Sequence, residues 1–104
     1  MNERENHKKE ELQKLAQEAY KILKEELERG DVDVTLAEAR AIDARTVGVQ
    51  GDERTYGYPI EITLYKDDKF IWSGRDELIE RLSTRITNEV RGVNRVVYVI
   101  GFRK

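Results

Sequence analysis

The chain has 104 residues, no cysteine and one histidine, and it carries 19 lysine and arginine residues against 21 aspartate and glutamate residues. This length suits one core, so we expect residues 1–104 to form a single domain whose first nine residues fray. With a net charge of −2, the chain lacks the positive field that would attract nucleic acids or anionic membranes, and we expect neither as a partner.

Composition also excludes several kinds of chemistry. Without cysteine, the chain has no disulfide, no thiolate metal site and no cysteine nucleophile. The one histidine, His7, lies in a polar N-terminal run and leaves little acid–base catalysis to assign. No apolar run is long enough for a membrane span, and the N-terminus does not resemble a signal peptide. We expect a cytoplasmic protein that is not an enzyme and needs no metal or cofactor.

The first third of the chain predicts one long amphipathic helix. Its apolar residues recur at spacings of three and four and are Leu12, Leu15, Ala16, Ala19, Ile22, Leu23 and Leu27. Gly30 tolerates a positive φ and ends the helix. Residues 35–44 leave two alternatives open. The alternation of Ala39 and Ala41 with charged residues favours a strand, whereas Thr35 and Glu38 also form a capping box that opens a helix.

The middle of the chain predicts extended structure. Gly51–Asp52 lies between two extended runs and indicates a tight hairpin. The following run alternates strictly, so one face carries Tyr56, Tyr58, Ile60, Ile62 and Leu64. Pro59 has no N–H to donate, which indicates a bulge or an unpaired edge at that position.

The last third predicts a short strand, a helix and a final strand. Residues 69–72 form the short strand, and cap residues at 73–76 open a helix that ends near Gly92. The apolar stripe of that helix is Leu78, Ile79, Leu82, Ile86 and Val90. The run at residues 96–100 is apolar at every position, which is typical of a strand buried on both faces. We therefore predict an α+β fold, a two-layer sandwich with two helices on one face of a mainly antiparallel sheet.

Because two helices cover one face only, the second apolar face of the last strand needs a partner chain. That face consists of Val97 and Val99, or else of Val96, Tyr98 and Ile100. The candidate interface is thus Val96, Val97, Tyr98, Val99 and Ile100.

Two blocks of sequence resemble a known family. Residues 45–59 read RTVGVQGDERTYGYP, and residues 85–98 read RITNEVRGVNRVVY. Both resemble the C-terminal dimerisation domain of GMP synthetase. The resemblance implies an α-β-β-α-β sandwich that pairs two protomers, so a homodimerising structural module is the leading hypothesis. A catalytic domain of a synthetase in trans is a further partner that the resemblance suggests.

The chain departs from the family where the family holds its nucleotide. Family members continue after the NRVVY strand into a segment reading KPP and then TIEWE, which helps to hold the xanthine nucleotide, whereas this chain reads VIGFRK. An accessory binder of xanthosine monophosphate, with a remnant site at Gln50, Asp52 and Arg54, is therefore an alternative. A nucleic-acid module of the KH kind is a further one, on fold analogy alone. The cysteine-free, charge-rich composition also suits an engineered derivative of the family.

Overall fold

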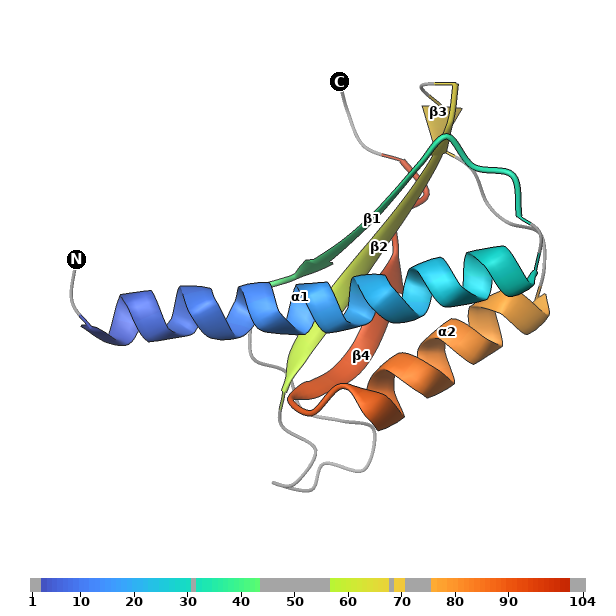
Figure 1. The fold of residues 1–104 in the computed structure, drawn as a ribbon. Helices are drawn as coiled ribbons and strands as arrows, with labels where there is room; N and C mark the ends of the chain where they lie inside the picture. The colour runs from blue at the N-terminus through green and yellow to red at the C-terminus, as the bar shows by residue number, and fades with distance from the viewer. Residues whose placement is uncertain (1–2, 31, 44–56, 68, 71–75, 102–104) are drawn as a thin grey trace.

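The computed structural model describes residues 3–30, 32–43, 57–67, 69–70 and 76–101. The elements follow in the order α1 (Glu3–Arg29), β1 (Leu36–Ala41), β2 (Tyr58–Lys66), β3 (Lys69–Phe70), α2 (Asp76–Glu89) and β4 (Val93–Tyr98). Both helices pack against the same side of the strands, so that the molecule has a helical layer and a sheet layer (Figure 1). The predicted α+β fold is confirmed.

Strand β2 is the centre of the sheet. β1 pairs with it antiparallel along one side, from Leu36 opposite Tyr65 to Ala41 opposite Ile60. Along the other side, β4 pairs parallel with the first half of β2, and β3 pairs antiparallel with its last two residues. Residues 36–41 therefore form a strand, which decides between the two structures that their sequence allowed.

The core is built on the alternation of β2. Ile60, Ile62 and Leu64 are all 0% exposed and face the helices. Helix α1 contributes one apolar stripe to this core, which consists of Leu15, Ala19, Ile22, Leu23 and Leu27. Helix α2 contributes a second stripe, which continues past its end and consists of Leu78, Leu82, Ile86 and Val90. The predicted stripes are confirmed for these residues, which are at most 6% exposed, whereas Leu12, Ala16 and Ile79 of the predicted stripes are only partly buried.

The last strand differs from its prediction. It runs from Val93 to Tyr98, so it begins before the apolar run at residues 96–100 and leaves Val99 and Ile100 beyond its end. The backbone explains the shift, because the N–H of Tyr58 donates to the C=O of Gly92 at 2.8 Å and starts the pairing there. Such a contact leaves no trace in side-chain polarity.

Two glycines meet where the parallel pairing begins. A Cβ atom added to Gly57 would lie 2.6 Å from the carbonyl oxygen of Gly92, closer than real Cβ atoms approach backbone. Gly92 itself has a φ of 97°, which L side chains rarely adopt. One residue further along, the β2–β4 register shifts between Tyr58 and Pro59, as expected for a residue that cannot donate to the ladder.

An ion-pair network joins the two helices. The Arg85 guanidinium donates to Glu26 and Glu25 of α1, both at 2.9 Å, and to Glu89 of its own helix at 2.7 Å. These carboxylates, Glu89 foremost, raise the pKa of Arg85, and Arg85 in turn lowers the pKa of Glu89. Arg85 thus joins α2 to α1 through two carboxylates, and Glu89 of its own helix holds the guanidinium group from the α2 side.

The burial of Glu26 was not expected from sequence, because this residue is not part of the predicted apolar stripe of the first helix. Its side chain is 2% exposed, and its Oε1 atom has no hydrogen-bond partner among the described residues. A buried carboxylate is costly unless it is paired, so the bond from Arg85 to its other oxygen is what makes this position tolerable.

We expect Gly57→Ala to lower the free energy of unfolding by about 1–3 kcal/mol, because the methyl group must displace backbone. Gly101→Ala is the matched control, since a Cβ added there meets nothing within 4 Å. Urea denaturation of both variants measures the difference, and equal midpoints would contradict the contact.

We expect Arg85→Met to lower the thermal midpoint more than Arg81→Met, because only the first leaves the buried Glu26 unpaired. Arg81 pairs with the exposed Glu77 at 3.9 Å.

The pH dependence of stability gives a second test of the network. Because Arg85 lowers the pKa of Glu89, this interaction stabilises the fold at pH values above the ordinary glutamate pKa of about 4.3, and the contribution is lost as pH falls through the pKa of the folded state. The Arg85→Met variant should not lose this contribution to stability on acidification, which calorimetric scans at several pH values would measure.

Candidate association surface

The register of β4 assigns its side chains to the two faces of the sheet. Val96 and Tyr98 lie opposite Ile60 and Ile62 of β2, and both pack against the core. Val97 lies opposite Glu61, which points away from the helices because it alternates with those core residues. The face without helices is called the open face from here on.

Val99 extends the open-face row of β4. Its N–H donates to the C=O of Ile62 at 2.9 Å, which continues the ladder one residue past the strand. Val97 and Val99 are both half-buried. The sequence left two sets of residues as the outer face, and this register selects Val97 and Val99. Ile100 follows them and is 76% exposed.

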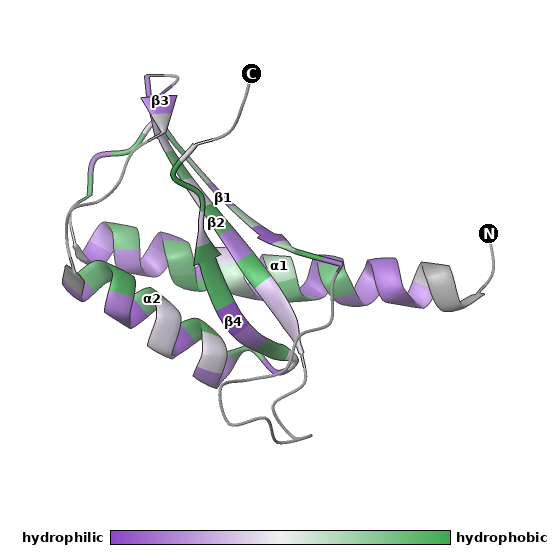
Figure 2. Cartoon of the chain, turned by 180° about the vertical axis from the view of Figure 1, so that it is seen from behind, coloured by the Kyte–Doolittle hydropathy of each residue, from purple (hydrophilic) through white to green (hydrophobic). Residues whose placement is uncertain are grey.

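The other half of the open face is polar. Arg40 of β1 donates to Glu61 of β2 at 3.0 Å across the strand pair. This ion pair borders a shallow hollow of about 340 Å³ that is also lined by Glu38, Thr63 and Tyr65. Seen from behind, hydrophobic and hydrophilic residues alternate along β2, whereas β4 carries a hydrophilic block followed by a hydrophobic block (Figure 2). The open face therefore combines an apolar edge at β4 with a charged edge at β1.

The remaining candidate residues cannot be placed. Gln50, Asp52 and Arg54, together with the predicted hairpin at Gly51–Asp52, lie outside the described residues. A nucleotide site at these positions stays a prediction.

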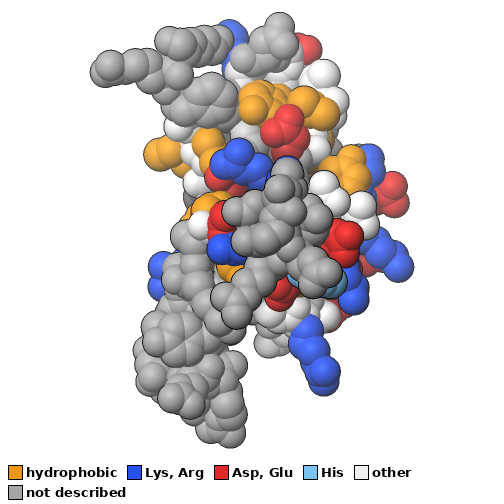
Figure 3. Space-filling model, turned by 90° about the vertical axis from the view of Figure 1, so that its left-hand side faces the viewer, with side chains coloured by type: hydrophobic (Ala, Val, Ile, Leu, Met, Phe, Trp, Pro, Cys, Tyr) orange, Lys and Arg blue, Asp and Glu red, His pale blue; other side chains and the backbone are white. Residues whose placement is uncertain are grey.

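The described surface at the N-terminal end of α1 carries mixed charge. Seen from the N-terminal end of α1, acidic and basic side chains are interspersed with small hydrophobic patches (Figure 3). Within the described ranges, no three or more histidine, aspartate or glutamate side chains gather in a way that could hold a metal ion. Neither helix in this part of the chain is long and apolar enough to cross a membrane.

Comparison with known families agrees with the two sequence blocks. The model of the GMP synthase C terminal domain matches residues 21–103. The chain belongs to this family. The resemblance read from the RTVGV hairpin and the NRVVY strand is thereby confirmed.

Individual relatives share about two residues in five with this chain. The GMP synthase [glutamine-hydrolyzing] of Prochlorococcus marinus (strain MIT 9303) is 44% identical over 82 residues, covering 73% of this chain and 16% of its own length. That of Parafrankia sp. (strain EAN1pec) is 40% identical over 86 residues, covering 76% and 16%. That of Halothermothrix orenii is 40% identical over 92 residues, covering 83% and 18%. The chain spans less than a fifth of the length of these GMP synthases.

We expect Val96→Thr to cost about 1 kcal/mol more unfolding free energy than Val97→Thr. The two substitutions are chemically identical, but only the first turns a hydroxyl group toward the apolar core. Urea denaturation of both variants at a low protein concentration measures the difference. Equal losses would mean that the faces of β4 are wrongly assigned.

Proposed function

We propose that this chain is a non-catalytic association module of the GMP synthase type, and that two copies pair through the open face at β4. The observation that carries the proposal is the position of Val97 and Val99 on a sheet face that neither helix covers. Apolar side chains on an uncovered sheet face favour contact with another chain. The family membership supports the same reading.

The charged edge of the open face limits where the two copies meet. Arg40 is highly exposed, and burying its pair with Glu61 would cost desolvation that the pair itself does not recover. Pairing centred on β4 covers Val97 and Val99 from both copies and leaves Arg40, which lies beyond β2 on β1, in water. Glu61, opposite Val97, lies at the border of this contact. The two-fold arrangement places the same patch on each side of the seam.

The contact is expected to be weak. Complete burial of an aliphatic side chain is worth about 1.5–3 kcal/mol, and the two valines are already half-buried in one copy. Association also costs several kcal/mol in lost translational and rotational freedom. A concentration-dependent dimer is therefore expected, and it would serve to bring together synthase catalytic domains joined to it or bound in trans.

The alternative of a nucleotide binder with a remnant site at Gln50, Asp52 and Arg54 stays a prediction, because these residues lie outside the described part of the chain.

We expect sedimentation equilibrium to detect a dimer as the protein concentration rises from low to high micromolar. Val97→Glu should abolish it, because two carboxylates would be buried unpaired at the seam. Ser83→Glu, on an exposed position of α2, is the matched control and should still pair. A wild-type chain that stays monomeric at high micromolar concentration, with an intact circular dichroism spectrum, would rule out the proposal.

A further inference from the structure

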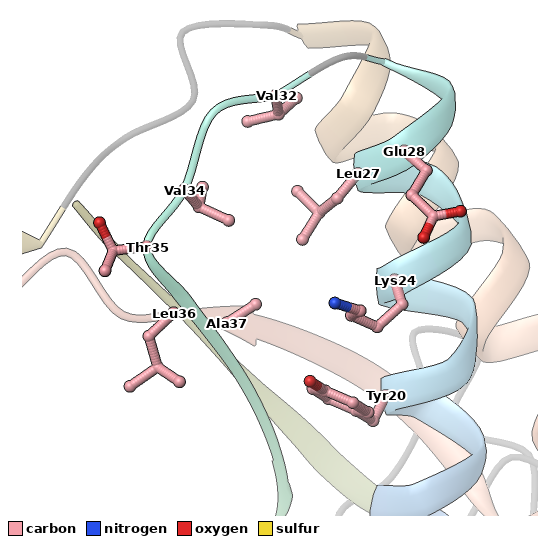
Figure 4. Close-up of a pocket in the computed structure, with 9 residues that line it drawn as sticks. All are labelled: Tyr20, Lys24, Leu27, Glu28, Val32, Val34, Thr35, Leu36 and Ala37. Atoms are coloured by element: carbon pink, nitrogen blue, oxygen red, sulfur yellow. The ribbon is translucent and has the colours of Figure 1, made fainter.

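A second hollow lies between α1 and the segment that leads into β1, away from the open face. It measures about 450 Å³, within the range of roughly 300–1,000 Å³ found for small-molecule sites. Its apolar lining consists of Leu27, Val32, Val34 and Ala37. The N–H of Val32 donates to the C=O of Leu27 at 3.1 Å, and this bond folds the segment back onto α1. Val32 and Leu27 therefore lie together at one end of the hollow (Figure 4).

Two polar groups enter the hollow from α1. The ammonium group of Lys24 and the hydroxyl group of Tyr20 both point from the helix toward the β1 side (Figure 4). Within the described part of the chain, neither group has an ion pair or a hydrogen bond that would occupy it. Glu28 is the acidic residue in the lining, and its carboxylate stays beside α1 instead of turning to Lys24 (Figure 4). The ammonium charge is therefore available to a ligand.

The rim of the hollow also exposes apolar surface. Three large hydrophobic side chains of the described residues are exposed, and two of them, Tyr20 at 40% and Leu36 at 49%, line this hollow. Exposed apolar side chains gathered beside a concave site indicate a surface that gains from being covered. The site thus combines an apolar end with the ammonium group of Lys24, the hydroxyl group of Tyr20 and the carboxylate of Glu28.

We propose that this hollow binds an organic monoanion with an apolar body, of the class of medium-chain aliphatic carboxylates. The aliphatic part lies against Leu27, Val32 and Val34 at the apolar end. The carboxylate accepts hydrogen bonds from the Lys24 ammonium and the Tyr20 hydroxyl. Charge complementarity favours an anion over a cation, because the ammonium group of Lys24 points into the hollow, whereas the carboxylate of Glu28, which also lines it, lies along α1.

This site goes beyond the proposed pairing and does not depend on it. The hollow lies on the α1 side of β1, whereas Val97 and Val99 lie on the open face at the opposite side of β2. A ligand in the hollow can therefore bind a monomer and a dimer alike, and failure of either proposal leaves the other standing.

The probe is sodium octanoate, titrated into the full chain at neutral pH while amide chemical shifts are recorded by NMR. We expect saturable shifts concentrated at residues 20–28 and 32–37. Octylammonium, which has the same chain length and the opposite charge, should produce weaker shifts there. The Val97→Glu variant should bind octanoate as the wild type does.

Substitutions separate the charge from the apolar contact. Lys24→Gln should weaken octanoate binding about fivefold, as expected for an exposed ion pair. Tyr20→Phe should weaken it about twofold to threefold. Lys21→Gln, an exposed lysine on α1 that does not line the hollow, is the matched control and should bind normally.

The proposal is overturned by any of three results. Shifts that do not saturate at millimolar octanoate would mean that there is no site. Equal binding of octylammonium would mean that Lys24 does not select the ligand. Equal weakening by Lys24→Gln and Lys21→Gln would mean that the anion responds to the general charge of α1.

Discussion

The complete burial of Ile60, Ile62 and Leu64 is the constraint on which the rest of the fold depends. One strand cannot exclude water from three successive side chains on the same face by itself, so other elements must pack over the whole length of that face. Helix α1 lies mainly over β1 and α2 over β4, and their apolar stripes converge on β2 from its two sides. The Arg85 network then joins the helices and keeps this cover closed.

Much of this arrangement is contained in periodicity. The strict alternation from Tyr58 to Leu64 and the spacing of the α2 stripe predicted the core, because each signal depends only on neighbours along the chain. The partner of Glu26 is Arg85, far away in sequence, and no local pattern reveals that this glutamate is buried. Likewise, the start of β4 is set by a backbone bond between Tyr58 and Gly92, which polarity does not encode.

The candidate association surface likewise combines features that local sequence patterns predict with features that they do not. A run that is apolar at every position, such as residues 96–100, carries no period and cannot state which side faces outward. Only the register against Ile60 and Ile62 separates Val96 and Tyr98 from Val97. The hollow beside Lys24 had no sequence signal at all, because it forms where the chain turns back from α1 into β1. The alanine residues of β1 let α1 approach this strand closely. The hollow lies beyond that close contact, beside Val32 and Val34.

The parallel pairing of β2 with β4 also has a consequence for the order of folding. It joins residues more than thirty positions apart, with β3 and α2 in the connection, whereas most other pairs in the sheet form between nearer segments. Closing so large a loop costs chain entropy before any contact compensates for it. Across small proteins, the logarithm of the folding rate falls as the mean sequence separation of contacting residues rises. We therefore expect the pairing of β2 with β4 at Gly57 and Gly92 to form late in folding. The strand that supplies the proposed pairing surface would then be the last to join the sheet.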